Sequence, residues 1–202
     1  MRLNQNPDVL LMGHPLLFQE QPQVAVGDIT SDDFQHNLEI LKQKQLSTLG
    51  VGIAAPQVGW PARVFSMGIS ELNRSRYPQA PDLPFAFWIN PQISDFSKNT
   101  CWTWEGCLSV PGMRAWIERP ESITAVGYNE RGERQEQSLS GFAARVFLHE
   151  LDHLNGKLFP MIVEDKSLII PNQSIEHQEA WAEGWPTESA HNTIRGQLSD
   201  VR

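Results

Sequence analysis

The chain has 202 residues, of which 40% are hydrophobic and 20% charged, a composition typical of globular domains. This length predicts one folded domain over residues 1–160, followed by a tail over residues 161–202. The formal net charge of −8 argues against broad contact with nucleic-acid phosphates, so we expect no DNA partner. No apolar run reaches the roughly 18 residues that a membrane helix needs. Because residues 1–7 also lack a signal region, we expect no membrane association and a cytoplasmic location.

Three features are expected before residue 60. The apolar segment 10–17, which glycine and proline interrupt, predicts an irregular stretch anchored on the core. A capping cluster at 30–33, followed by apolar residues at helical spacing, predicts an amphipathic helix that ends near residue 50. Segment Gly50–Gly59 is dense in small residues, which let backbone run close to a ligand, and Gln57 could donate into such a site. The alternative is a tight loop with Gln57 on the surface, and this segment alone leaves both open.

Strands dominate the middle of the chain. Residues rich in β-branched and aromatic types predict strands at 63–67, 85–89, 114–118, 122–128 and 133–139. Together with one buried helix, they indicate an α+β domain in which mostly antiparallel sheets wrap around that central helix.

The tail has a different character. Residues 161–202 hold seven acidic and three basic side chains, so this segment carries −4 of the charge of −8. We expect one short helix around residues 175–183 and fraying beyond Pro186. Trp181 and Trp185, if buried, would tie the tail to its own core or to a second subunit.

The segment Ser140–Gly156 predicts the central helix and the first candidate site. Ser140 is a possible N-cap, Asn155-Gly156 is a stop signal, and the residues between them are apolar on nearly all sides. His149 and His153 lie four apart, so both imidazoles can bind one cation, and Glu150 can reach a water at that cation. The alternative is a core helix whose histidines only find hydrogen bonds.

Two histidines leave a catalytic metal short of a third protein ligand. Cys107 is the better candidate, because a thiolate binds metals strongly and the surrounding glycine and proline residues make its turn rigid. Cys101, on the preceding strand, is the alternative. With these two thiols alone, no disulfide framework is expected. On ligand type alone, the metal would be zinc.

Three segments, in this order and at this spacing, carry a family resemblance. Gly50–Gln57, Glu105–Ser109 and His149–His153 resemble the three signature motifs of peptide deformylase, and the likeness runs from about residue 10 to residue 160. Two departures are visible. Leu148 stands where the family often has Gln, and the tail does not resemble the basic C-terminal helix of some members.

The resemblance implies a function and a set of site residues. Family members remove the formyl group from the N-terminal formyl-methionine of nascent chains, which makes residues 1–160 a catalytic metallohydrolase domain. The implied metal is one divalent ion per chain, Fe²⁺ in the cell, with Zn²⁺ or Ni²⁺ able to occupy the same ligands. The implied metal ligands are Cys107, His149 and His153, with Glu150 as general acid and base and with Gln57 and the Leu108 N–H as the oxyanion site.

The same resemblance implies where a substrate binds. Val51 and Gly52 would pair with the peptide backbone as with an added strand, and Phe142 and Val146 would form a wall for the methionine side chain. The expected partners are formyl-methionyl peptides of nascent chains. Ribosome proximity would be transient and would not depend on a basic tail, since residues 161–202 are acidic.

Glu105 precedes the Cys107 turn and would be poorly solvated there. We therefore expect a cationic partner that fixes the turn, with Arg119 and Arg145 as candidates. The alternative is that Glu105 only accepts hydrogen bonds from backbone N–H groups.

Two other function classes remain open from the residues alone. A zincin-type endopeptidase would need Cys107 to be unrelated to the metal, and no third ligand follows the helix convincingly. A metal-stabilised binding module would need a closed site of four ligands, which only Cys101 could complete.

Overall fold

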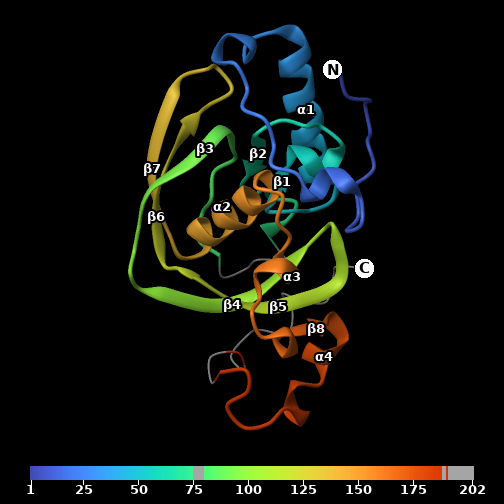
Figure 1. The fold of residues 1–202 in the computed structure, drawn as a ribbon, viewed down its shortest axis with the longest axis vertical. Helices are drawn as coiled ribbons and strands as arrows, with labels where there is room; N and C mark the ends of the chain where they lie inside the picture. Colours follow the sequence, from blue (N-terminus) through green and yellow to red (C-terminus); the bar gives the residue numbers. More distant parts are fainter. Residues whose placement is uncertain (75–79, 188–189, 191–202) are drawn as a thin grey trace.

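The helix with the HExxH spacing, α2 (Gly141–Leu154), lies near the centre of the molecule, with strands around it (Figure 1). The structure is a computed structural model that describes residues 1–74, 80–187 and 190. Helix α2 packs against strands of both sheets, which confirms the predicted α+β class with antiparallel sheets around a central helix.

Among the described residues, the strands form two antiparallel sheets. One has the order β1-β2-β3-β6-β7 and the other the order β4-β5-β8. Strand β1 is therefore an edge strand. The strands are β1 (Gly52–Ala54), β2 (Val64–Met67), β3 (Ala86–Phe96), β4 (Thr100–Cys107), β5 (Val110–Pro120), β6 (Ser122–Tyr128), β7 (Arg134–Ser140) and β8 (Ile169–Pro171).

The remaining helices are short except for α1. They are α1 (Asp32–Ser47), α3 (Phe159–Ile162) and α4 (Asn172–Glu176), with 3-10 turns η1 (Pro15–Phe18), η2 (Val26–Asp28), η3 (Ala55–Val58), η5 (Lys166–Leu168) and η6 (Gln178–Ala180). Within the described ranges, no helix has the length and apolar character to cross a membrane. The predicted anchor at 10–17 includes most of η1, and Leu17 in it is fully buried.

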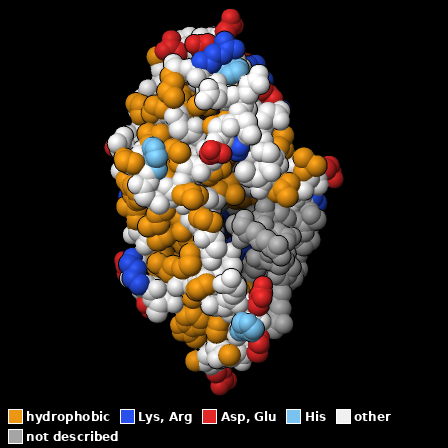
Figure 2. Space-filling model, turned by 90° about the vertical axis from the view of Figure 1, so that its right-hand side faces the viewer, with side chains coloured by type: hydrophobic (Ala, Val, Ile, Leu, Met, Phe, Trp, Pro, Cys, Tyr) orange, Lys and Arg blue, Asp and Glu red, His pale blue; other side chains and the backbone are white. Residues whose placement is uncertain are grey.

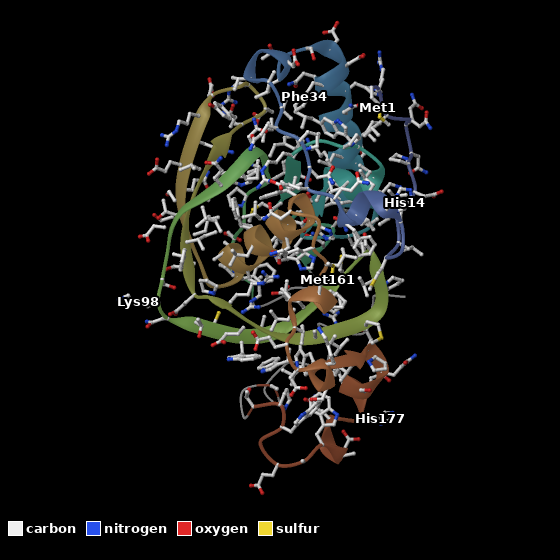
Figure 3. The ribbon with its side chains drawn as sticks, in the orientation of Figure 1. Met1, His14, Phe34, Lys98, Met161 and His177 are labelled. Atoms are coloured by element: carbon white, nitrogen blue, oxygen red, sulfur yellow. The ribbon has the colours of Figure 1, made fainter. Side chains whose placement is uncertain are left out.

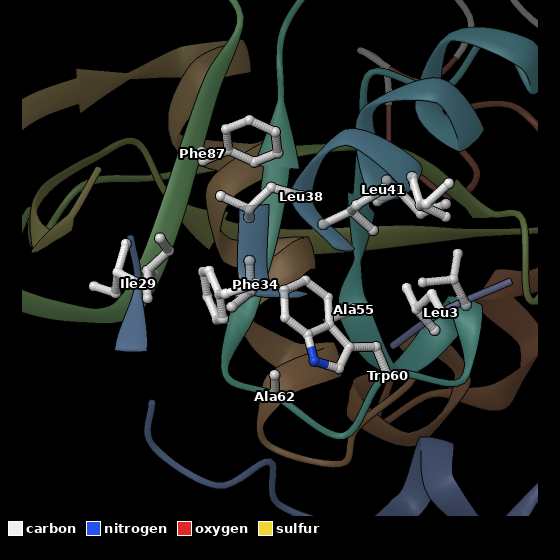
Figure 4. Packing of buried hydrophobic residues seen from close by; sticks show 14 residues of the cluster. Leu3, Ile29, Phe34, Leu38, Leu41, Ala55, Trp60, Ala62 and Phe87 are labelled. Carbon is white, nitrogen blue, oxygen red and sulfur yellow. The ribbon is translucent and has the colours of Figure 1, made fainter. Parts of the chain in front are cut away.

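Helix α1 begins at the predicted capping cluster, although the Ser31 side chain makes no capping hydrogen bond. Ser31 occupies the N-cap position, and Asp32 and Asp33 stand in the first turn, where the helix dipole favours negative charge. Phe34 and Trp60 meet edge-to-face, with ring centroids 5.0 Å apart (Figure 4). Burying a side chain of this size contributes about 1.5–3 kcal/mol, so this cluster holds α1 against the β1 region.

Helix α2 is held by a second aromatic cluster. Phe147 is fully buried, with its ring centroid 5.1 Å from that of Phe65 and 4.9 Å from that of Trp88. Ser140 occupies the predicted N-cap position, but its side chain makes no capping hydrogen bond. Gly156 ends the helix in the left-handed conformation, with φ +68°. The histidine-bearing helix is thus anchored by packing on its apolar face.

Two strands, β3 and β5, are longer than predicted, whereas β2, β6 and β7 agree with the prediction to within one residue at each end. Strand β3 continues past Asn90, which takes a positive φ of 52°, and it has a bulge where it pairs with β6. Strands β4 and β5 form a long hairpin, of which the sequence indicated the part at 114–118 and a strand at Cys101 without bounds. Trp104 and Trp116, which are paired across this hairpin, pack with residues of the C-terminal segment.

The C-terminal segment corrects one expectation. A single helix at 175–183 is wrong, because α4 ends at Glu176 and only the short turn η6 follows. The segment also adds β8 to the sheet of β4 and β5, on the far side of that hairpin from α2 (Figure 1). Trp181 packs against Trp104 and Trp185, with centroids 5.7 and 5.0 Å apart, so the tail contacts its own chain. Fraying was expected beyond Pro186, and of these residues 188–189 and 191–202 lie outside the described residues.

Candidate active site

Helix α2 and the end of β4 bring Cys107, His149 and His153 together. One ligand atom of each lies within 4.8 Å of the other two, and Cys107 Sγ is 3.2 Å from His153 Nε2. The cluster is largely buried, and two imidazoles with one thiol suit a divalent transition metal. Cys101 is elsewhere, with its thiol 3.4 Å from Arg145 Nη2, so it does not complete a fourth position.

Local strand geometry aims Cys107 at the histidines. The β4–β5 register shifts between Gly106 and Cys107, and Cys107 then pairs with Val110 across a tight turn. Within this turn, the backbone N–H of Ser109 donates to Cys107 Sγ over 3.4 Å. The turn therefore points the thiol toward α2 and supplies it with a hydrogen bond.

The surroundings favour the thiolate form of Cys107. Burial by itself would raise the pKa of the thiol, but the positive charge of His153 and the hydrogen bond with His149 outweigh it and lower the pKa to about 5. A thiolate is the form that binds metal, so the site prepares its sulfur ligand at neutral pH.

Glu105 accepts hydrogen bonds from two guanidinium groups and one imidazole. Its Oε1 accepts from Arg119 Nε at 2.6 Å and from Arg145 Nη1 at 2.7 Å. Its Oε2 accepts from Arg119 Nη2 at 2.9 Å and lies 2.9 Å from His149 Nδ1. Both arginines suggested by the sequence contact this carboxylate, so it does not depend on backbone N–H groups alone.

These contacts keep Glu105 ionised and orient the first histidine. Burial would raise the pKa of Glu105, but the hydrogen bonds and charges of Arg119 and His149 hold it well below its usual value. Arg119 also binds Asp152 at 2.8 Å, which fixes the guanidinium between two carboxylates. With Nδ1 engaged by Glu105, His149 directs Nε2 to the cation site.

Glu150 is buried beside the cluster. It is 4% exposed, and its Oε2 has no hydrogen-bond partner within the described part of the chain. Burial raises the pKa of this carboxyl to about 7, although the charges of His149 and His153 act in the opposite direction. A buried carboxylate with one free oxygen can accept a proton from a bound water and release it again.

Gln57 is inside the site, so the surface alternative is wrong. Its side chain is 2% exposed, and its Nε2 donates to Ser109 Oγ at 3.1 Å and lies 3.6 Å from Cys107 Sγ. Its Oε1 accepts from the Ala54 N–H at 2.8 Å, which fixes the orientation of the amide. Leu108 follows Cys107 in the chain, and its side chain packs against the hydrophobic cluster that contains Phe34 and Trp60.

The other expected substrate-binding residues lie at β1 and on α2. The Val51 carbonyl accepts from the Gly68 N–H at 2.8 Å, so it faces β2. In an antiparallel pair, successive residues alternate in direction, which turns the backbone of Gly52 to the open edge of β1. Phe142 and Val146 lie on α2 and pack in the hydrophobic cluster that contains Phe65 and Phe147. Val146 is buried and Phe142 is half-buried.

Sequence reasoning missed the role of Ser109. This residue is fully buried, accepts from Gln57 and donates its N–H to Cys107 Sγ. The available signal was a polar residue two positions after the cysteine, in a turn that was already expected to be rigid.

A buried Cys/His/His cluster with a carboxylate on an HExxH helix, in this α+β fold, defines a metal-dependent hydrolase. A family model described as polypeptide deformylase matches residues 7–167. The chain belongs to this family, whose enzymes are metal-dependent hydrolases that remove the N-formyl group from nascent peptides. The endopeptidase and binding-module alternatives are therefore set aside.

Individual relatives agree with this assignment. Peptide deformylase 1 of Nitrosomonas europaea is 36% identical over 157 residues, covering 78% of this chain and 87% of the relative. A class I type b peptide deformylase from Acinetobacter baumannii, with Met-Ala-Ser bound, has a TM-score of 0.74 and 35% identity, covering 78% of this chain and 98% of that one. A Synechococcus elongatus peptide deformylase in complex with actinonin has a TM-score of 0.70 and 29% identity, covering 91% of both chains.

Proposed function

We propose that Cys107, His149 and His153 hold the single divalent metal with which this chain deformylates nascent peptides. The observation that carries the proposal is the approach of their three ligand atoms to within 4.8 Å of one another. A bound metal supplies Lewis-acid chemistry, which acidifies water and polarises the formyl carbonyl. We propose Fe²⁺ as the metal in the cell, with Zn²⁺ and Ni²⁺ able to occupy the same ligands.

Glu150 is the proposed proton carrier. It takes a proton from the attacking water and later delivers it to the amine that leaves as the formyl group is released. Its buried position and its pKa of about 7 support this role, because a group that titrates near neutrality can both accept and donate.

Gln57 and Leu108 are the proposed donors to the developing oxyanion. The Gln57 Nε2 lies beside Cys107, and Leu108 is the next residue in the chain, so both donors adjoin the metal ligands. Donors of this kind contribute most when they are held in place before the reaction, as the fixed amide of Gln57 is.

The peptide is proposed to add to the open edge of β1. Gly52 offers its backbone there, while Val51 supports the edge through its bond to Gly68. Phe142 and Val146, one turn apart on α2, are proposed to contact the methionine side chain. The proposed role of Glu105, Arg119 and Arg145 is to hold His149 and the Cys107 turn in position.

The cellular setting is also proposed. The enzyme acts in the cytoplasm, near the ribosome only in passing, with residues 1–160 as the catalytic domain and the acidic residues 161–202 as a tail that does not bind ribosomal RNA.

A substrate pair tests the proposal. Anaerobically purified protein, loaded with Fe²⁺, Zn²⁺ or Ni²⁺, is assayed on formyl-Met-Ala-Ser and on an N-terminally blocked peptide with internal bonds only. We expect release of formate from the first and no cleavage of the second. Internal cleavage, or metal binding without any turnover, would contradict the proposed function. Highest turnover with Zn²⁺ in an oxygen-free assay would contradict the proposal for iron.

A further inference from the structure

We propose that the backbone of Leu10–Met12 is a strap that fixes the spacing of the two loops carrying the oxyanion donors. The inference rests on the proposed roles of Gln57 and Leu108, and it assigns a positioning function to a segment that does not itself adjoin the metal ligands.

The strap contacts both loops through alternate backbone N–H groups. The Leu10 N–H donates to the Gln57 carbonyl at 2.8 Å, and the Met12 N–H donates to the Ser109 carbonyl at 2.7 Å. Gln57 and Ser109 are 52 residues apart in the chain and belong to different elements. One short segment therefore joins two parts of the site that the sheets do not pair with each other.

A third hydrogen bond joins the two loops directly, so that the strap and the two loops form a closed ring. Gln57 Nε2 donates to Ser109 Oγ at 3.1 Å, on the side of the loops that faces the metal ligands. A shift of either loop relative to the other would lengthen this bond or one of the two strap bonds. Because Leu108 immediately precedes Ser109, the strap sets the position of its backbone as well.

The strap is held by its backbone and by the segment that follows it. The side chains of Leu11 and Met12 are 53% and 48% exposed, so burial contributes little to their placement. His14, labelled in Figure 3, follows them in the chain. Its Nδ1 accepts from the Leu16 N–H at the start of η1. Buried Leu17 then anchors η1, which packs against the η3 turn that carries Gln57.

The face in Figure 2 is consistent with a segment held in this way. Figure 2 shows the right-hand side of Figure 1, where the N-terminal segment runs, and many hydrophobic side chains are exposed over one half of this face. The exposed side chains of Leu11 and Met12 belong to this segment, whose backbone makes the two hydrogen bonds.

Met12→Pro tests the strap with little other change. The His14 N–H donates to the Leu11 carbonyl at 3.0 Å, which closes a turn with Met12 in its second position and Gly13, at φ +113°, in its third. Proline is favoured in the second position of such turns, so the substitution removes the N–H and leaves the turn intact. We expect kcat and kcat/KM on formyl-Met-Ala-Ser to fall together by about tenfold, as for an interaction made in the transition state.

A matched control separates the strap from general effects of proline. The Gly132 N–H donates to the Asn129 carbonyl at 3.0 Å, so Glu130 occupies the corresponding position of the turn between β6 and β7. Glu130→Pro should keep wild-type kcat, metal content and melting temperature. Loss of metal from Met12→Pro, or a fall in its activity matched by a fall in its folded fraction, would show a merely structural role and overturn the proposal.

A double-mutant cycle tests whether the strap acts through Gln57. Gln57→Ala alone should lower kcat, and adding Met12→Pro to it should lower kcat less than in the wild type, because the spacing of the two loops matters less once one of the two donors is gone. Independent, multiplying losses would overturn the strap. If Gln57→Ala lowers kcat and Met12→Pro does not, the strap fails and the proposed oxyanion role stands. If Gln57→Ala has no effect, both fail.

Discussion

Gly52 has no side chain at the point where β1 meets the carboxylate of Glu150. A Cβ added to Gly52 would lie 2.8 Å from Glu150 Cδ, which is closer than real Cβ contacts allow. The edge strand and the proposed proton carrier can occupy their positions together only because residue 52 is glycine.

Gly52→Ala should therefore lower turnover without removing the metal. The added methyl group must push Glu150 or β1 aside, and a displacement of about 1 Å at a reacting group can cost on the order of a hundredfold in rate. The measurement is kcat on formyl-Met-Ala-Ser beside metal content and melting temperature. A variant with normal kcat would show that Glu150 need not stay where it lies.

Glu150→Gln should retain the metal and lose most turnover. The amide has nearly the same shape as the carboxyl group but cannot take a proton, and general acid–base catalysis contributes about 10²–10⁴-fold. Elemental analysis measures whether the metal is retained, and single-turnover kinetics measure the loss of turnover. Loss of the metal would indicate that Glu150 is a ligand and not the proton carrier.

The two cysteines should behave differently. Cys107→Ala should lose the metal, because it removes one of three ligands, whereas Cys101→Ala should keep it, since that thiol lies beside Arg145. Both variants are purified with equal metal supplied, and bound metal per chain is compared. Equal loss in the two variants would contradict the three-ligand site.

Glu105→Gln should destabilise the protein in a pH-dependent way. The pKa of Glu105 is held below its usual value of 4.5, so its contribution to stability is present above pH 4.5 and is lost as the pH falls toward the folded-state pKa. Breaking a buried ion pair costs about 3–5 kcal/mol. The difference in unfolding free energy between the two proteins should be largest at neutral pH and shrink in acid. Metal affinity should fall as well, because His149 loses its orienting partner.

The features that could be predicted are those with local causes. Helix α1 follows from its capping residues and apolar spacing, and α2 from its apolar length and the Asn155-Gly156 stop. The candidate site residues came from three short motifs whose side chains carry recognisable chemistry. Each of these signals is contained within a few neighbouring residues.

The features that were missed depend on distant partners. Strand β8 has three residues, and only pairing with β5 makes it a strand. The helix expected at 175–183 breaks because the tail instead follows the tryptophan-rich face of β4 and β5. The contacts of Leu10 and Met12 use backbone N–H groups, which every non-proline residue has, so their side chains gave no sign of them.

The tail should matter for stability more than for catalysis. Truncation after Pro171 keeps β8 but removes Ile175, Trp181 and Trp185, which pack on the face of the β4–β5 hairpin away from α2. Uncovering Trp104 should lower the melting temperature, while activity on a short formyl-peptide should stay within a few fold. Because residues 161–202 carry −4, ribosome co-sedimentation at physiological salt should not change. A large loss of co-sedimentation, or loss of activity in a truncated protein that still folds and holds its metal, would contradict this prediction.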